Sequence, residues 1–98
     1  MEIVKTKDGD KLTVAVIGRL DTTTSPQLEQ ELEPELGNVK KITFDFEKLD
    51  YISSAGLRVL LAAQKTMNKQ GSMVICNVSP EVKEIFDVTG FSDILTIE

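Results

Sequence analysis

The feature that most constrains the fold is an alternation between strand-like and helix-like segments along the whole chain. Strand-like segments alternate apolar and polar residues, and helix-like segments repeat an apolar residue every three or four positions. Strands in direct succession pair antiparallel, whereas strands separated by a helix are joined by a crossover and run parallel. The order β-β-α-β-α-β-α-β therefore predicts an α/β fold, a mixed sheet with helices packed mainly on one face. The expected strands are 2–7, 11–18, 40–46, 72–78 and 93–98.

Turn and cap residues set the ends of these segments. Asp8-Gly9-Asp10 lies between two apolar runs and predicts a tight hairpin. Ser25-Pro26 and Ser79-Pro80 each place a capping side chain before a proline, which predicts that helices begin there. In the first helix, Pro34 predicts either a kink or an end one residue earlier. The second and third helices are expected to end at Gly71 and Gly90.

Composition argues against several classes of function. The chain contains no histidine, which removes the Ser-His-Asp triad and every zinc site that uses histidine. Its single cysteine, Cys76, cannot form an internal disulfide and is expected in a core strand. The net charge of -5 argues against a nucleic-acid partner. No phosphate-cradling G-x-x-x-x-G-K-[ST] loop is present, so no nucleotide or other cofactor is expected.

Length and hydropathy predict one soluble domain over residues 1–98. No run approaches the roughly 20 apolar residues of a membrane span. The first ten residues mix acidic and basic side chains and lack the apolar core of a signal peptide. We therefore expect a cytoplasmic protein without a membrane partner.

The stretch Ser53-Ser54-Ala55-Gly56 precedes the second helix and has three interpretations. One serine can simply cap the helix by accepting a hydrogen bond from its first turn. A catalytic serine is disfavoured, because the chain has neither histidine nor the G-x-S-x-G motif of hydrolases. A phosphate acceptor suits the position, since a helix N-terminus tolerates a phosphate and small neighbours leave the hydroxyl accessible. The local residues favour the plain cap, and they permit the phosphate acceptor without demanding it.

Several motifs, in order, resemble one known family. They are "VIGRLDTTT", "ITFDFEKLDYISSAGLRVLL" and "GSMVICNVSPEVKEIFDVTGFSDILTI", which together cover almost the whole length. In these motifs the chain resembles the anti-sigma factor antagonists, which are single STAS domains of bacterial partner-switching systems. The resemblance implies the STAS fold and a regulatory protein with no catalysis of its own.

The resemblance also implies a phosphorylation switch. The unmodified protein is expected to bind an anti-sigma factor with serine kinase activity, which releases a sigma factor. Phosphorylation by this kinase ends the binding, and a metal-dependent serine phosphatase restores it. The phosphoacceptor of the family lies two positions before its Gly-Leu pair, which is Ser54 here, with Ser53 as the alternative. Ser53 occupies a position where many members have aspartate, so the chain departs from the family there.

Residues near the acceptor form the expected partner surface. Asp21 is interpreted either as a neighbour of the phosphorylation site or as a residue that only turns the chain before the first helix. Asp45 is either a site neighbour or a solvent-facing strand residue. Leu57 is expected in the core, whereas Arg58 is expected to be exposed by its helical phase. The full expected surface is Asp21, Thr22, Thr23, Asp45, Ser53, Ser54, Ala55, Gly56 and Arg58.

The substitution at Ser53 supports an alternative function. A STAS-type domain without a working switch can serve as a scaffold, or as an accessory subunit of a transporter or a larger signalling assembly. Such a protein would form a complex that ignores phosphorylation.

Overall fold

A computed structural model describes all residues, 1–98, and contains a five-stranded mixed sheet with three α-helices. The sheet has the order β1-β2-β3-β5, and β4 pairs with the far end of β2. This arrangement confirms the predicted α/β fold with a mixed sheet. The elements are β1 (Glu2–Asp8), β2 (Lys11–Leu20), α1 (Ser25–Leu36), β3 (Lys41–Asp45), β4 (Leu49–Ile52), α2 (Ser54–Gln70), β5 (Ser72–Cys76), α3 (Pro80–Thr89) and the 3-10 turn η1 (Phe91–Asp93).

The first two strands form the predicted hairpin, and the others add in parallel. β1 and β2 are antiparallel, with Asp8 opposite Lys11 across the turn. β2 pairs parallel with β3, and β3 with β5, so each connection crosses over through a helix. The chain alternates its side chains between the two faces of this sheet, as strands must.

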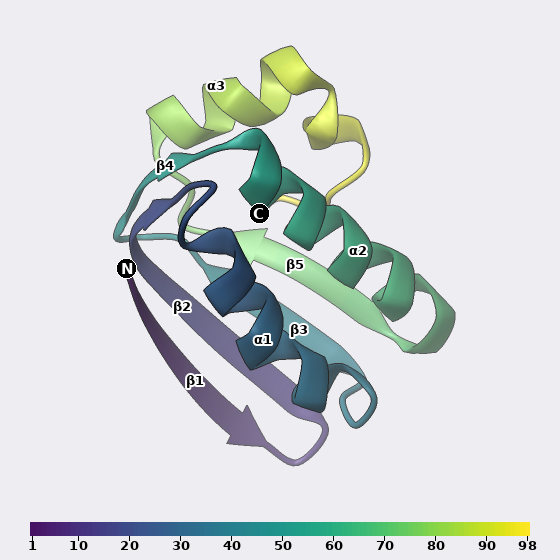
Figure 1. Ribbon diagram of the computed structural model, residues 1–98. Coiled ribbons are helices and arrows are strands. Elements are labelled where there is room, and N and C mark those ends of the chain that lie inside the picture. Colours follow the sequence, from purple (N-terminus) through teal and green to yellow (C-terminus); the bar gives the residue numbers. More distant parts are fainter.

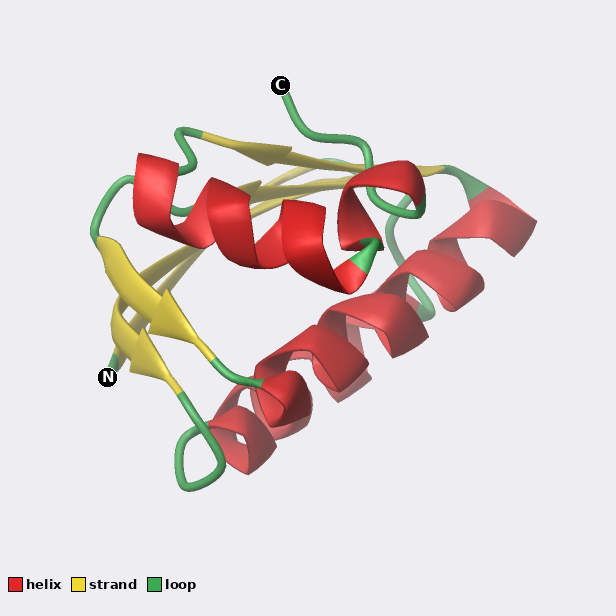
Figure 2. Ribbon diagram, turned by 90° about the horizontal axis from the view of Figure 1, so that it is seen from above, coloured by secondary structure: helices red, strands yellow, loops and turns green.

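One face of the sheet carries the core. Leu12, Val14 and Phe44 point from the strands toward the helices and are almost completely buried. Figure 1 shows α1 and α2 side by side in front of this face, with their N-terminal ends at the same end of the sheet. α3 packs against β4 instead, and in Figure 2, viewed from above, it crosses the end of the sheet. None of the helices combines the length and hydrophobicity that a transmembrane span requires.

Two predictions about strands are wrong. β4 is absent from the predicted strands, but it pairs parallel with Gly18–Leu20 because β2 continues past 18, with a register shift between Gly18 and Arg19. The final strand at 93–98 does not form. Gly90 takes a left-handed conformation that turns the chain into η1, and only Ile97 then makes an isolated bridge with Ile75.

α1 passes through Pro34 and ends at Leu36. An end before Pro34 was one of the two expectations, and it is wrong. Proline removes one backbone N–H, but burial of Leu28 and Leu32 against the sheet holds the helix in place. The exposed side chain of Asn38 donates a hydrogen bond to the Pro34 carbonyl oxygen at 3.2 Å, which satisfies that acceptor near the helix end.

α2 ends before Gly71, as predicted, although the reason differs from the expected one. The backbone of Gly71 is extended, not left-handed. A side chain there would place its Cβ 1.8 Å from the Lys40 carbonyl oxygen. Gly71 is therefore required by the close approach of two backbone segments where β5 begins beside β3.

Candidate functional site

The first turn of α2 separates the roles of the two serines. Ser53 is the N-cap in an extended conformation, and its Oγ accepts a hydrogen bond from the Gly56 N–H at 3.4 Å. Ser54 is the first helical residue; its side chain is exposed and takes no part in the cap. The cap and the accessible hydroxyl, which the local sequence allows at either serine, thus lie on adjacent residues.

The strands fix the position of this turn. The Ser53 N–H donates to the Leu20 carbonyl oxygen at 2.8 Å, which joins the end of β4 to the end of β2. A Cβ at Gly56 would lie 2.8 Å from both Ile52 Cγ1 and Leu20 Cγ. Only glycine lets α2 start so close to these strands, and Leu57 then enters the core, as expected.

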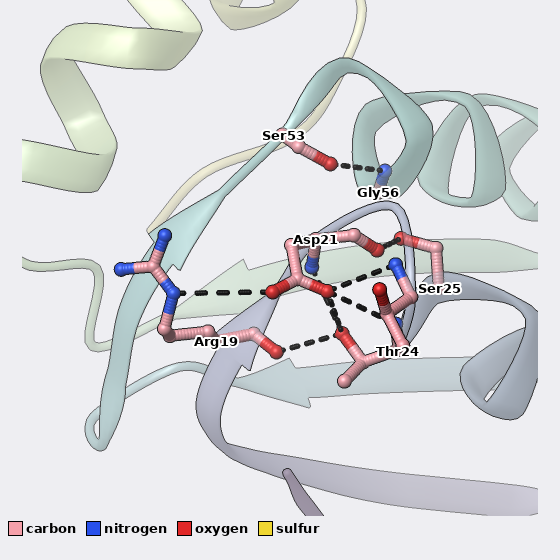
Figure 3. A network of polar contacts seen from close by, with 7 residues as sticks. Arg19, Asp21, Thr24, Ser25, Ser53 and Gly56 are labelled. Carbon is pink, nitrogen blue, oxygen red and sulfur yellow. Dashed lines mark hydrogen bonds and ion pairs between the residues drawn. The ribbon is translucent and has the colours of Figure 1, made fainter.

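Asp21 orders the loop just before the neighbouring helix, α1. Its Oδ1 accepts hydrogen bonds from the N–H groups of Thr23 and Thr24, both at 3.0 Å (Figure 3). The Thr24 backbone N–H bond is the largest cause that lowers the pKa of Asp21, and the Thr24 hydroxyl, the Thr23 N–H and the Arg19 charge act in the same direction. One of the two interpretations of Asp21 is that it turns the chain before the first helix, and these hydrogen bonds agree with that role.

Ser25 is not the cap of α1, contrary to the prediction from Ser25-Pro26. It is the first helical residue and is buried, and its hydroxyl donates to the Asp21 carbonyl oxygen at 2.5 Å. Thr24 occupies the N-cap position without a side-chain cap bond. The Asp21 carboxylate holds the loop N–H groups ahead of the helix, and the Ser25 hydroxyl ties the first residue of α1 to the residue that follows β2.

A groove between the starts of α1 and α2 brings several expected residues together. Its volume is about 420 Å³, and Thr22, Ala55 and Arg58 are among the residues that line it. Arg58 is exposed, as predicted, and forms no ion pair within the chain. The first turn of α2 itself carries no acidic residue, whereas Glu29 of α1 lines the same groove.

Arg19 and Tyr51 belong to the site and were not predicted. The Arg19 guanidinium carbon lies 4.5 Å from the centroid of the Tyr51 ring, and Arg19 Nε lies 3.9 Å from Asp21 Oδ2 (Figure 3 shows this second contact). The two residues face each other because β2 pairs with β4. The predicted strands end at 18 and leave out 49–52, so the sequence patterns do not bring these two residues together.

Asp45 lies apart from the other expected residues. It ends β3 between the buried Phe44 and Phe46, so its side chain points to the face of the sheet away from α1 and α2. There its Oδ1 accepts hydrogen bonds from the Glu47 N–H and from Asn77 Nδ2, each at 3.1 Å. Thr22 and Thr23, by contrast, are exposed in the loop beside Asp21.

Cys76 ends β5 and is half-buried, close to the core-strand position expected for it. Burial is the largest cause that raises the pKa of its thiol, and the nearby carboxylates of Asp45 and Glu98 add to it. The thiolate is therefore disfavoured, which is typical of a structural cysteine.

Comparisons with known proteins agree with this geometry. The family model described as the STAS domain matches residues 2–98. BtrV of Bordetella bronchiseptica, named as an anti-sigma factor antagonist, is 34% identical over 99 residues, which cover 99% of this chain and 85% of that protein. The anti-sigma-B factor antagonist of Listeria monocytogenes is 30% identical, with 97% and 85% of the two chains covered.

Among solved structures, the anti-sigma factor antagonist SpoIIAA in its unphosphorylated form shares the fold. It superposes with a TM-score of 0.79 over 99% of this chain and 87% of that chain, at 19% identity. The same protein, a Bacillus cell fate determinant, is also known in its phosphorylated form, with a TM-score of 0.78, 19% identity, and 99% and 91% of the two chains covered. With the family model and the curated relatives, this fold establishes that the chain belongs to the STAS-domain family and is a relative of the anti-sigma factor antagonists.

Proposed function

We propose that the unmodified protein binds an anti-sigma factor that is also a serine kinase, and that this kinase switches the binding off by phosphorylating Ser54. The observation that carries the proposal is the exposed Ser54 hydroxyl at the first position of α2, beside a serine that already supplies the cap. The curated relatives are named as antagonists of anti-sigma factors, and SpoIIAA is known in both phosphorylation states.

Ser54 is a better acceptor than Ser53 on geometric grounds. Modification of Ser53 would remove the hydrogen bond that its Oγ accepts from Gly56. A phosphate on Ser54 leaves that cap intact. It also lies at the positive end of the helix dipole, near free N–H groups. Arg58 follows one helical turn later with no ion-pair partner, and it is a suitable neighbour for the added charge.

The added charge explains how binding ends without a change of fold. A phosphoserine carries about -1.5 to -2 charges. At the centre of an interface that charge must lose its water against the partner surface, and each 1.4 kcal/mol of penalty weakens binding about tenfold. The proposed interface comprises Ser54 and its exposed or half-buried neighbours Thr22, Thr23, Ala55 and Arg58. Asp21, Ser53 and Gly56 position the loop and helix start that carry this interface, and Asp45 lies outside it.

Downstream of this step, binding of the anti-sigma factor frees its sigma factor, and a metal-dependent serine phosphatase restores the unmodified protein. These steps follow from the same proposal and involve no catalysis by this chain.

The test is intact mass and peptide mapping after incubation with ATP and a kinase-type anti-sigma factor of the same organism. We expect one phosphate, located on Ser54, and weaker binding of the modified protein. Ser53→Ala is the matched control and should still accept phosphate, while Ser54→Ala should not. Phosphorylation of Ser54→Ala at the wild-type rate would contradict the assignment. A complex that forms and survives phosphorylation would support the non-switching scaffold instead.

A further inference from the structure

The groove beside Ser54 continues along the seam between α1 and α2. A second hollow of about 310 Å³ lies between these helices, and Glu29 and Val59 line both hollows. Since α1 and α2 lie side by side with their N-terminal ends together (Figure 1), the joined hollows run from the Ser54 end toward the C-terminal half of both helices. We call this continuous feature the α1–α2 groove.

The glutamates of α1 divide into two pairs with different surroundings. Glu31 and Glu35 face β1, where Lys5 lies 3.0 Å from Glu31 and 3.4 Å from Glu35, and Lys7 lies 3.6 Å from Glu35. Glu29 and Glu33 line the groove; they are exposed and have no cation within ion-pair distance. The α1 side of the groove therefore forms a negative rim of two carboxylates, one helical turn apart, that make no ion pair within this chain. Arg58 lines the hollow near the helix starts together with Glu29, but it does not line the second hollow, where Glu33 lies.

The floor of the groove is apolar. Leu32 and Ala63 are buried beneath it, and Leu36 and Val59 border it. On the α2 side the wall is formed by Ala62 and Thr66, whose small side chains leave the groove open. An apolar floor below an anionic rim is complementary to a segment with apolar side chains on one face and cations beside them.

We propose that the α1–α2 groove docks an amphipathic helix of the anti-sigma factor that carries lysine or arginine one turn apart. This inference rests on the proposed function, because Thr22, Ala55 and Arg58 of the proposed interface line one end of the groove. The unpaired Glu29 and Glu33 select a cationic partner. They disfavour a second copy of this chain, whose own groove has the same negative rim and whose net charge is -5.

The test compares two double variants that change the net charge equally. Glu29→Lys with Glu33→Lys reverses the rim, whereas Glu47→Lys with Glu84→Lys reverses two exposed glutamates outside the groove. Binding is measured by calorimetry with the anti-sigma factor that phosphorylates Ser54. We expect the rim variant to bind about tenfold more weakly or worse and the control to bind within about twofold of wild type, since contacts at close charge pairs exceed the effect of net charge. Equal weakening by both variants would overturn the proposal.

A second variant tests the shape of the groove without a change in charge. Ala62 is exposed, so Ala62→Trp fills the groove without entering the core. We expect weaker binding and an unchanged urea unfolding midpoint. A photo-crosslinking residue at position 66 should then label a segment of the anti-sigma factor with basic residues three or four positions apart. A cross-link to a second copy of this chain, or to a segment without basic residues, would contradict the proposal.

The two proposals fail differently. If the anti-sigma factor binds and phosphorylates Ser54 while both groove variants bind like wild type, the groove proposal is wrong and the switch stands. If no kinase-type anti-sigma factor binds the wild-type protein, the proposed function is wrong, and the docking groove is rejected with it.

Discussion

At the scale of single residues, the site depends on side chains that are small or absent. Gly56 allows α2 to begin in contact with Ile52 and Leu20, and Ser53 caps that helix so that Ser54 stays free. Asp21 orders the loop before α1 by accepting hydrogen bonds from the N–H groups of Thr23 and Thr24. The starts of α1 and α2 thus meet at one end of the sheet, and their loops and first turns form the surface we assign to the partner.

Gly56→Ala should destabilise the fold. The added Cβ would lie 2.8 Å from two inner atoms of buried side chains, which must shift, and overpacking of this kind costs about 1–3 kcal/mol. Urea unfolding measures the change. Gly37→Ala is the control, because nothing lies within 4 Å of its Cβ position and its backbone is already helical. Equal effects of the two substitutions would contradict the steric explanation.

Asp21→Asn should reduce stability in a pH-dependent way. The pKa of Asp21 is lowered in the folded protein, so its ionised form contributes stability that is fully present above the ordinary aspartate pKa of about 3.9 and is lost as the pH falls through the folded value. The gap between the urea midpoints of wild type and variant should be largest near neutral pH and should close in acid. The pKa of Asp87 is also lowered, chiefly by hydrogen bonds from Lys83 and Ser92. Asp87 is present in both proteins, so its contribution to the pH dependence drops out of the difference between their midpoints. A gap independent of pH would refute the role of the charge.

At the scale of elements, helix α2 carries the proposed switch at its capped end. Its first turn has no acidic residue, and its apolar side, Leu57, Leu60 and Met67, anchors the helix on the sheet. The buried side of the helix is thus held against the sheet, while Ser54 at its start is exposed to solvent. This arrangement lets a modification at Ser54 change the surface while the buried side stays packed.

Ser53→Ala and Ser54→Ala should separate stability from modification. Loss of the Ser53 cap should lower the free energy of unfolding by about 0.5–1 kcal/mol, the lower part of the range for caps, because its hydrogen bond is long at 3.4 Å. Ser54→Ala should leave stability within about 0.5 kcal/mol of wild type, since the side chain is exposed. Thermal and urea unfolding measure both. A larger loss from Ser54→Ala would mean that Ser54, and not Ser53, is the cap.

At the scale of the whole molecule, one face of the sheet is occupied by the core and the proposed interface lies at one end of the helical layer. β2, β4 and the starts of α1 and α2 converge there, and α3 packs against β4. Four elements thus form the proposed interface, so a charge added at Ser54 does not require the fold to change.

A negative charge at Ser54 should therefore weaken partner binding without weakening the fold. Ser54→Asp places an acidic residue in the first turn of α2, where the helix dipole favours it by about 0.3–1 kcal/mol. We expect an unfolding temperature equal to or above that of wild type, together with lost binding to the anti-sigma factor. Ser54→Asn is the uncharged control and should still bind. A Ser54→Asp protein that is unstable, or that binds like wild type, would contradict this account.

Local patterns in the sequence were sufficient to predict the hairpin turn and the first two helices. The Asp8–Asp10 turn, the leucine repeat of α1 and the apolar side of α2 each follow from contacts within a few residues, so periodicity and turn chemistry predicted them. The motif around Ser54 likewise indicated the family, because it is contiguous in the chain. Cys76 and Arg58 lie close to where their local patterns placed them.

The strand pairings, side-chain orientations and groove that join residues distant in the sequence could be seen only in the folded chain. The short β4 forms because the end of β2 offers it backbone partners, and this pairing brings Arg19 over Tyr51. The last strand fails because the chain turns at Gly90 and leaves β5 a single bridge. Asp45 points away from Ser54 because of the face on which β3 places it, and the α1–α2 groove exists because two helices 18 positions apart pack together. Hydrogen bonds between strands and packing between helices join residues that no local pattern relates, so only the folded chain reveals them.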